Sequence, residues 1–300
     1  MRATFINTLI ELARKDDKIF LLTADMGFSV LEPFAEEFPD RYINTGITEQ
    51  ATVSIAAGLA LSGYKVYAYS ITPFITMRCY EQVRLDVAYM NTNVKIIGVG
   101  AGFEYGAAGA THHAIEDISL MRSLPNMKVV CPGDNLEAKA ILQQSAQDPS
   151  PMYIRIGRNK EAQYHKDNTP IMIGKAVTIN KGEDYAIITT SNTLSIGKKH
   201  LDEAKAAGKN PYLISMHTVK PLDKDIIMEL IEKDIAIYSL EEANIVGGLG
   251  SAIAEVIAES GKAVKFKRIG IPDQFTHHVG SQDYHRQFYK LDLSLDFQNL

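Results

Sequence analysis

The chain has 300 residues, of which 46% are hydrophobic and 22% are charged, and its net charge is −5. A chain of this length can form two globular domains with buried cores. Charges of both signs are interspersed, which excludes a basic nucleic-acid-binding face, and no apolar run approaches the roughly 18 residues of a membrane span.

Two features of the sequence favour a cytoplasmic protein. The N-terminal segment MRATFINTLIELARKDD has the pattern of an amphipathic helix and lacks the features of a signal peptide. Cys79 and Cys131 are far apart and have no zinc-ligand spacing, and two unpaired thiols fit a reducing compartment. We therefore expect a soluble cytoplasmic chain that binds neither nucleic acid nor membranes.

The first half of the chain alternates helical patterns with short apolar runs. Strands are predicted at residues 19–23, 41–44, 65–69, 95–99, 128–131 and 152–156. Helices are predicted at residues 4–14, 48–61, 80–89, 115–123 and 136–146. Short strands separated by helices indicate βαβ units and a mostly parallel sheet. We expect a doubly wound α/β domain over residues 1–158.

The second half repeats this alternation on a smaller scale. Residues 159–172 are polar and have no hydrophobic period, so they are interpreted as an interdomain linker. Strands are then predicted at residues 185–189, 211–215, 235–239 and 264–269, and helices at 196–207, 224–232 and 249–260. The expected fold class is therefore α/β, with a second and smaller doubly wound domain over residues 173–300.

The segment NTGITEQ, residues 44–50, places Glu49 in the first turn of a predicted helix. A carboxylate at this place is favoured by the positive end of the helix dipole. The helix continues as ATVSIAAGLALSG, and such small residues allow another backbone or a ligand to approach closely. The local pattern alone favours a simple helix cap over a ligand contact for Glu49.

Two further segments could contact a ligand. Phe74 follows Pro73 just beyond a strand, where open α/β sheets bind ligands, and its ring could stack on a flat heterocycle or simply fill the core. Residues 98–117, GVGAGFEYGAAGATHHAIED, form a glycine-rich loop that lacks both the dinucleotide fingerprint and the P-loop lysine. His112 lies at its rim. Because His112 and His113 are adjacent, they should point apart, which argues against a metal site.

Taken in order, these segments resemble the transketolase family of thiamine-diphosphate enzymes. The shared segments are GITEQ, the loop that contains Phe74 and ends in RCYEQVR, the THHAIED segment, and LMRSLPNMKVVCPGD. HTVKPLD at residues 217–223 and EEANIVGGLGSAIAE at residues 241–255 resemble the family's third domain. The resemblance runs from Arg2 to about Asp283, so it covers nearly the whole chain.

The resemblance implies a role for several residues toward thiamine diphosphate. Glu49 would hydrogen-bond the aminopyrimidine ring and so promote removal of the proton from the thiazolium carbon. Phe74 would stack on the pyrimidine. Asp25, Ile71 and Met77 would complete the cofactor-binding set, in a cradle that is more aliphatic than in some members.

The resemblance also implies a substrate site. Arg2, Ser29 and Arg158 match positions that bind the sugar phosphate, and two arginines with a hydroxyl suit a phosphate or another tetrahedral anion such as a sulfonate. His112 would lie near the reacting carbons and would take part in catalysis.

Two positions depart from the family pattern. Gly100 replaces a histidine of the glycine-rich loop, and Ala108 replaces an aspartate. In the family these two side chains recognise sugar hydroxyl groups. We therefore expect a substrate with fewer or differently placed hydroxyl groups, or a residue elsewhere in the chain that recognises them.

One part of the expected enzyme lacks a counterpart in this chain. The family binds the Mg²⁺ of the cofactor through a G-D-G motif, which is absent from this sequence. The diphosphate-binding domain and its Mg²⁺ would then lie on another polypeptide, in an α2β2 assembly. This chain would be the C-terminal subunit of a split transketolase that transfers a two-carbon ketol unit between a ketose phosphate and an aldose.

Three alternatives remain open at this stage. The chain could be the beta subunit of a 2-oxo-acid or acetoin dehydrogenase decarboxylase. It could also belong to an enzyme like 1-deoxyxylulose-5-phosphate synthase. The non-enzymatic alternative is a regulatory or scaffolding subunit that kept the fold.

Overall fold

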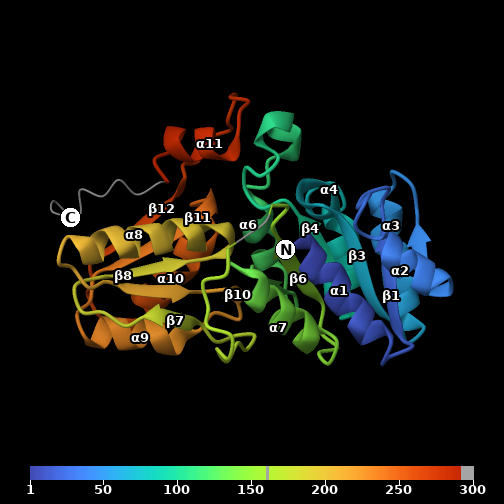
Figure 1. Ribbon diagram of the computed structural model, residues 1–300, viewed down its shortest axis with the longest axis horizontal. Coiled ribbons are helices and arrows are strands. Elements are labelled where there is room, and N and C mark those ends of the chain that lie inside the picture. Colours follow the sequence, from blue (N-terminus) through green and yellow to red (C-terminus); the bar gives the residue numbers. More distant parts are fainter. Residues whose placement is uncertain (160–161, 292–300) are drawn as a thin grey trace.

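The computed structural model describes residues 1–159 and 162–291. Two sheets lie side by side, and each is covered by helices (Figure 1). The predicted α/β class with two doubly wound units is confirmed. The seven-stranded sheet has the order β10-β5-β6-β4-β3-β1-β2, and the five-stranded sheet has the order β12-β11-β8-β9-β7.

The larger sheet belongs mainly to the first half of the chain. Its strands are β1 (Ile19–Thr23), β2 (Tyr42–Asn44), β3 (Lys65–Ile71), β4 (Val94–Val99), β5 (Lys128–Val130), β6 (Met152–Ile156) and β10 (Thr218–Lys220). The helices of this half are α1 (Arg2–Ala13), α2 (Glu32–Glu37), α3 (Glu49–Leu61), α4 (Thr72–Thr76), α5 (Tyr80–Gln82), α6 (Asp117–Ser123) and α7 (Asn135–Ser145). All strand pairs of this sheet are parallel except β10 with β5.

The smaller sheet is formed by the second half. Its strands are β7 (Val177–Asn180), β8 (Ala186–Thr189), β9 (Tyr212–Ser215), β11 (Ile237–Asn244) and β12 (Phe266–Ile271), and its helices are α8 (Leu194–Ala206), α9 (Lys224–Glu232), α10 (Leu249–Ser260) and α11 (Gln282–Phe288). Only β7 runs antiparallel to its neighbour.

Strand β1 illustrates why the first sheet is covered on both faces. Its residues IFLLT are all buried, and successive side chains point to opposite faces of the sheet. Phe20 and Leu22 join one core cluster, whereas Ile19 and Leu21 join the other. A continuous apolar run is therefore the pattern of a strand that lies between two helical layers.

Several elements differ from the predictions. The helix predicted at residues 80–89 is one turn of α5 followed by a π-helix at Val83–Tyr89, and the helix predicted to begin at residue 115 begins at Asp117. The strand predicted at residues 264–269 is displaced to Phe266–Ile271. Strand β10 was not predicted, and it lies in the second half of the sequence but pairs with β5 at the edge of the first sheet.

Candidate functional site

Most of the predicted site residues lie in the segments that follow the strands at one edge of the first sheet, in loops or in the first turns of helices. Strands β1, β3 and β4 are parallel, so the loops that follow them emerge at the same edge. This edge is where open α/β sheets bind ligands. The loop after β4, residues 100–116, projects beyond the sheet and lies beside α11 of the second half (Figure 1).

Glu49 is the first residue of α3 and is only 3% exposed. Its Oε2 accepts a hydrogen bond from Arg78 Nη1 at 2.9 Å, so the carboxylate pairs with Arg78 and does not cap the helix. Its Oε1 makes no hydrogen bond within the described residues. One oxygen of the Glu49 side chain therefore stays available to a ligand.

Phe74 lies on α4 and is half-buried, whereas its neighbour Ile75 fills the core. The guanidinium carbon of Arg78 lies 4.5 Å from the centroid of the Phe74 ring. The His112 ring contacts Phe74 edge-on, with centroids 5.0 Å apart and an interplanar angle of 67°. Contacts therefore connect Glu49, Arg78, Phe74 and His112 in one continuous row.

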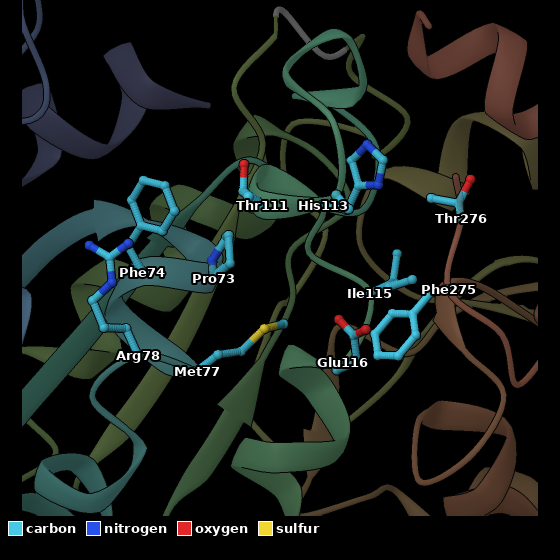
Figure 2. A pocket seen from close by; sticks show the side chains of 11 residues that line it. Pro73, Phe74, Met77, Arg78, Thr111, His113, Ile115, Glu116, Phe275 and Thr276 are labelled. Atoms are coloured by element: carbon cyan, nitrogen blue, oxygen red, sulfur yellow. The ribbon is translucent and has the colours of Figure 1, made fainter. Parts of the chain in front are cut away.

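A cavity of about 350 Å³ adjoins this row. Its wall includes Phe74, Met77 and Arg78 on one side and Phe275 and Thr276 of the second half on the other (Figure 2). This volume falls in the usual range for small-molecule sites. The half-buried side chain of Met77 faces the cavity.

Three residues of the predicted cofactor-binding set lie outside this cavity wall, namely Glu49, Ile71 and Asp25. Ile71 is half-buried at the end of β3, next to α4. Asp25 has a left-handed backbone with φ of 50°. Its N–H donates to Asn44 Oδ1 at 3.0 Å, and its Oδ1 accepts from Asn44 Nδ2 at 3.2 Å. Asp25 thus joins the loop after β1 to the end of β2.

The structure brings together two of the predicted anion-binding residues but not the third. Arg2 Nε donates to the backbone oxygen of Arg158 at 3.1 Å. Ser29 is exposed, with φ of 61°, and its N–H donates to Glu32 Oε1 at 2.7 Å. In the described part of the chain, Ser29 forms no hydrogen bond with Arg2 or Arg158.

His112 and His113 have different surroundings, as expected for adjacent residues. His112 is half-buried against Phe74, and its Nδ1 lies 2.9 Å from Thr111 Oγ1. His113 is buried edge-on against Phe103 at 5.0 Å, and burial lowers the pKa of its imidazole. Within the described residues no group of three or more His, Cys, Asp or Glu side chains is placed to hold a metal ion.

Sequence reasoning missed two neighbours of the site. Arg78 lies in the quoted RCYEQVR segment, but its pairing with Glu49 depends on how the chain turns after α4. Tyr105 lies in the glycine-rich loop, where its ring contacts the Arg158 guanidinium at 4.4 Å.

Among the helices that the structure describes, none has the length and apolar character of a membrane span.

Family comparisons assign both halves of the chain. The family described as "Transketolase, pyrimidine binding domain" matches residues 1–162, and "Transketolase, C-terminal domain" matches residues 174–293. The chain is 37% identical to an apulose-4-phosphate transketolase subunit from Phocaeicola vulgatus, over 94% of this chain and 90% of that protein. It is 34% identical to a 6-deoxy-6-sulfo-D-fructose transketolase subunit from Clostridium sp. strain MSTE9, over 97% and 90%.

Comparison of structures gives the same assignment. The fold is similar to that of a split gene transketolase solved as an inactive beta4 tetramer, with a TM-score of 0.89 and 32% identity. The match covers 97% of this chain and 93% of that one. The chain therefore belongs to the transketolase family of thiamine-diphosphate-dependent transferases, and it corresponds to the C-terminal subunit of a split transketolase.

Proposed function

We propose that this chain, with a partner subunit, transfers a two-carbon ketol unit from a ketose phosphate to an aldose. The observation that carries the proposal is the buried Glu49 carboxyl at the start of α3, in one row with Phe74 and His112. A carboxyl, an aromatic ring and an imidazole at the ligand-binding edge of a parallel sheet match the needs of the pyrimidine half of thiamine diphosphate and of a reacting carbonyl.

The residues present fit this cofactor. Glu49 has one carboxylate oxygen without a hydrogen bond in the described chain, and Phe74 is half-buried next to a cavity. Glu49 would hold or share a proton with the pyrimidine ring, and Phe74 would stack against it, with Ile71, Met77 and Asp25 around them. When bound, thiamine diphosphate supplies an electron sink for the two-carbon unit.

The substrate end of the site would bind an anion. Arg2 and Arg158 lie together, and Ser29 would add a hydroxyl from the loop after β1. The two relatives are named for substrates with a phosphate or a sulfonate, and both groups are tetrahedral anions that suit arginine. His112 would act near the reacting carbons, since its ring touches Phe74.

The remainder of the enzyme is proposed to lie on a second chain. That chain would carry the diphosphate-binding domain and would ligate Mg²⁺, in an α2β2 heterotetramer of the cytoplasm that acts in carbohydrate metabolism. The inactive beta4 state named for the structural relative supports a need for the partner. Residues 1–158 would serve as the pyrimidine-binding domain and residues 173–300 as the C-terminal domain, joined by the linker at 159–172.

Reconstitution tests the proposal. The purified chain is combined with a candidate partner that carries G-D-G and a downstream asparagine, together with thiamine diphosphate and Mg²⁺, and carbon–carbon transfer is measured over a panel of ketose phosphates and aldoses. Glu49→Gln should lower kcat by at least about a hundredfold, the lower range for a proton-transferring group. Glu81→Gln, on an exposed side chain, is the matched control and should keep full activity.

Three outcomes would contradict the proposal. The first is the absence of transfer with every ketose phosphate. The second is release of CO₂ from a 2-oxo acid, which would support a dehydrogenase-type or synthase-type enzyme. The third is the absence of thiamine diphosphate binding to the two-chain complex in calorimetry, which would support a scaffolding subunit.

A further inference from the structure

The space above Gly100 is filled by the side chain of Tyr105. Gly100 has φ of +90°, a conformation that glycine adopts at little cost. A Cβ atom built at this position would lie 2.3 Å from Cδ2 of Tyr105. No side chain can therefore occupy position 100 while Tyr105 keeps its place, so the loss of the family histidine and the presence of this tyrosine are coupled.

Tyr105 contacts the residues proposed to bind substrate. The guanidinium carbon of Arg158 lies 4.4 Å from the centroid of the tyrosine ring, and the His112 ring centroid lies 6.0 Å from it. The half-buried Tyr105 hydroxyl makes no hydrogen bond within residues 1–159 and 162–291. Its ring is held between a cation and an imidazole, while its hydroxyl is left for a ligand or for water.

The backbone around Tyr105 is held in place by the buried Glu104 carboxylate. Glu104 Oε2 accepts hydrogen bonds from Ala101 N at 2.9 Å and from Arg158 N at 2.7 Å. This one oxygen therefore joins the start of the glycine-rich loop to Arg158, two residues beyond the end of β6. Tyr105 and Arg158 are fixed relative to each other before any substrate arrives, as a specificity site requires.

We propose that Tyr105 determines the substrate of this enzyme in place of the two polar groups missing at Gly100 and Ala108. Its ring closes the space that a hydroxyl-bearing carbon would need, and its hydroxyl joins Arg2 and Arg158 around the anionic end of the sugar. The substrate class is a phosphate- or sulfonate-terminated sugar with no hydroxyl on the carbons that face Tyr105. This inference rests on the proposed ketol transfer and deepens it.

A pair of acceptors that differ by one hydroxyl tests the proposal. The reconstituted two-chain enzyme is assayed with ribose 5-phosphate and 2-deoxyribose 5-phosphate. The wild-type enzyme should favour the deoxy sugar by about tenfold or more in kcat/KM. The face of the Tyr105 ring offers no hydrogen-bond partner, so a sugar hydroxyl packed against it loses water without replacing those hydrogen bonds. Tyr105→Ala removes this ring and should reduce the preference to near one.

A second variant separates the hydroxyl from the ring. Tyr105→Phe keeps the ring over Gly100, so the preference between the two sugars should persist. It should raise KM for both acceptors, and the inhibition constant for inorganic phosphate, by about tenfold, while kcat stays close to the wild-type value. Tyr89→Phe, which removes an 80% exposed hydroxyl, is the matched control and should change neither quantity.

The outcomes distinguish this inference from the proposed function. Wild-type transfer with no preference for the deoxy sugar, or a preference that Tyr105→Ala leaves intact, overturns the role of Tyr105 while ketol transfer stands. An unchanged phosphate inhibition constant in Tyr105→Phe overturns the anion contact. If the wild-type enzyme transfers no carbon unit to either sugar or to any other acceptor, the proposed function itself fails.

Discussion

The buried side chain of His165 holds its segment of the chain against α7, and its removal should abolish a defined part of the pH dependence of stability. His165 Nδ1 lies 2.8 Å from Asp134 Oδ2, and its side chain is 1% exposed. Its Nε2 lies 3.1 Å from Glu137 Oε1, an ion pair whose angles fall outside those of a hydrogen bond. Asp134 also caps α7 by accepting from Glu137 N at 3.0 Å.

The magnitude follows from the titration of His165. Burial lowers the pKa of this imidazole, but the carboxylates of Asp134 and Glu137 outweigh it and raise the pKa to about 9. Against an ordinary value near 6.5, this difference is worth about 3 kcal/mol of folding free energy. Because the folded-state pKa is raised, the stabilisation is complete below about pH 6.5 and is lost as the pH rises through 9.

Asp134, the carboxylate partner of His165, sets the low-pH limit of this stabilisation. Burial raises the pKa of Asp134, but the hydrogen bonds from His165 and from backbone N–H groups lower it to about 2. A lowered folded-state pKa stabilises the protein above the unfolded value near 3.9, and this contribution is lost as the pH falls through 2. Both shifts describe one interaction, so their energies are not added.

Urea unfolding at pH 6 and pH 9 measures the effect. Lys95 and Glu241 both have a pKa of about 7, so the readout is the difference in unfolding free energy between wild type and His165→Gln. This difference should shrink by about 2–3 kcal/mol from pH 6 to pH 9. His200→Gln is the control, because burial lowers the pKa of His200 to about 4 and the imidazole is neutral throughout. A difference for His165→Gln that is the same at both pH values would refute the reasoning.

Three substitutions test the packing that supports the site. Arg155 Nε lies 2.9 Å from the buried Asp117 carboxylate. Arg155→Met leaves this carboxylate without its cation and should lower the free energy of unfolding, measured in urea, by about 3–5 kcal/mol. Added salt should not restore the lost stability in full, because the carboxylate is buried. Phe103→Ala should cost about 3–5 kcal/mol and speed proteolytic cleavage of α11, detected by mass spectrometry, since the fully buried ring stacks on that helix. Gly98→Ala should lower Tm at a cost of about 1–3 kcal/mol, because its Cβ would lie 2.8 Å from the Tyr153 ring. An unchanged urea midpoint, cleavage rate or Tm, respectively, would contradict each expectation.

The fold was largely predictable because buried parallel strands have a distinctive pattern. IFLLT at β1 is uninterrupted by polar residues, and only a strand covered on both faces needs such a run. Strand β10 gave no such signal. Thr218–Lys220 is three residues long, and its place beside β5 depends on a contact between distant parts of the chain, which no local periodicity encodes.

The sequence predicted individual residues of the candidate site better than it predicted the contacts between them. Glu49 and Phe74 were found from short segments that resemble a family, and the structure places them near one another through Arg78. That arginine could not be assigned a role from sequence, because an ion pair across 29 positions depends on the turn between α4 and the π-helix. The resemblance marked Gly100 as a departure from the family histidine, but it did not indicate that a side chain of the same loop fills the space above this glycine.

The second half of the chain contributes to the site by fixing the conformation of the glycine-rich loop, residues 100–116. A segment with left-handed glycines at positions 100, 102 and 109 would be expected to adopt many conformations. Here Phe103 inserts into the core of the second half, and its N–H donates to Glu242 Oε1 at 2.7 Å. Arg286 of α11 in turn pairs with Glu242 Oε2 at 2.5 Å. Both of these anchors come from residues beyond 173. Without the second half, the loop would keep only the anchor that Glu104 makes to Ala101 and Arg158.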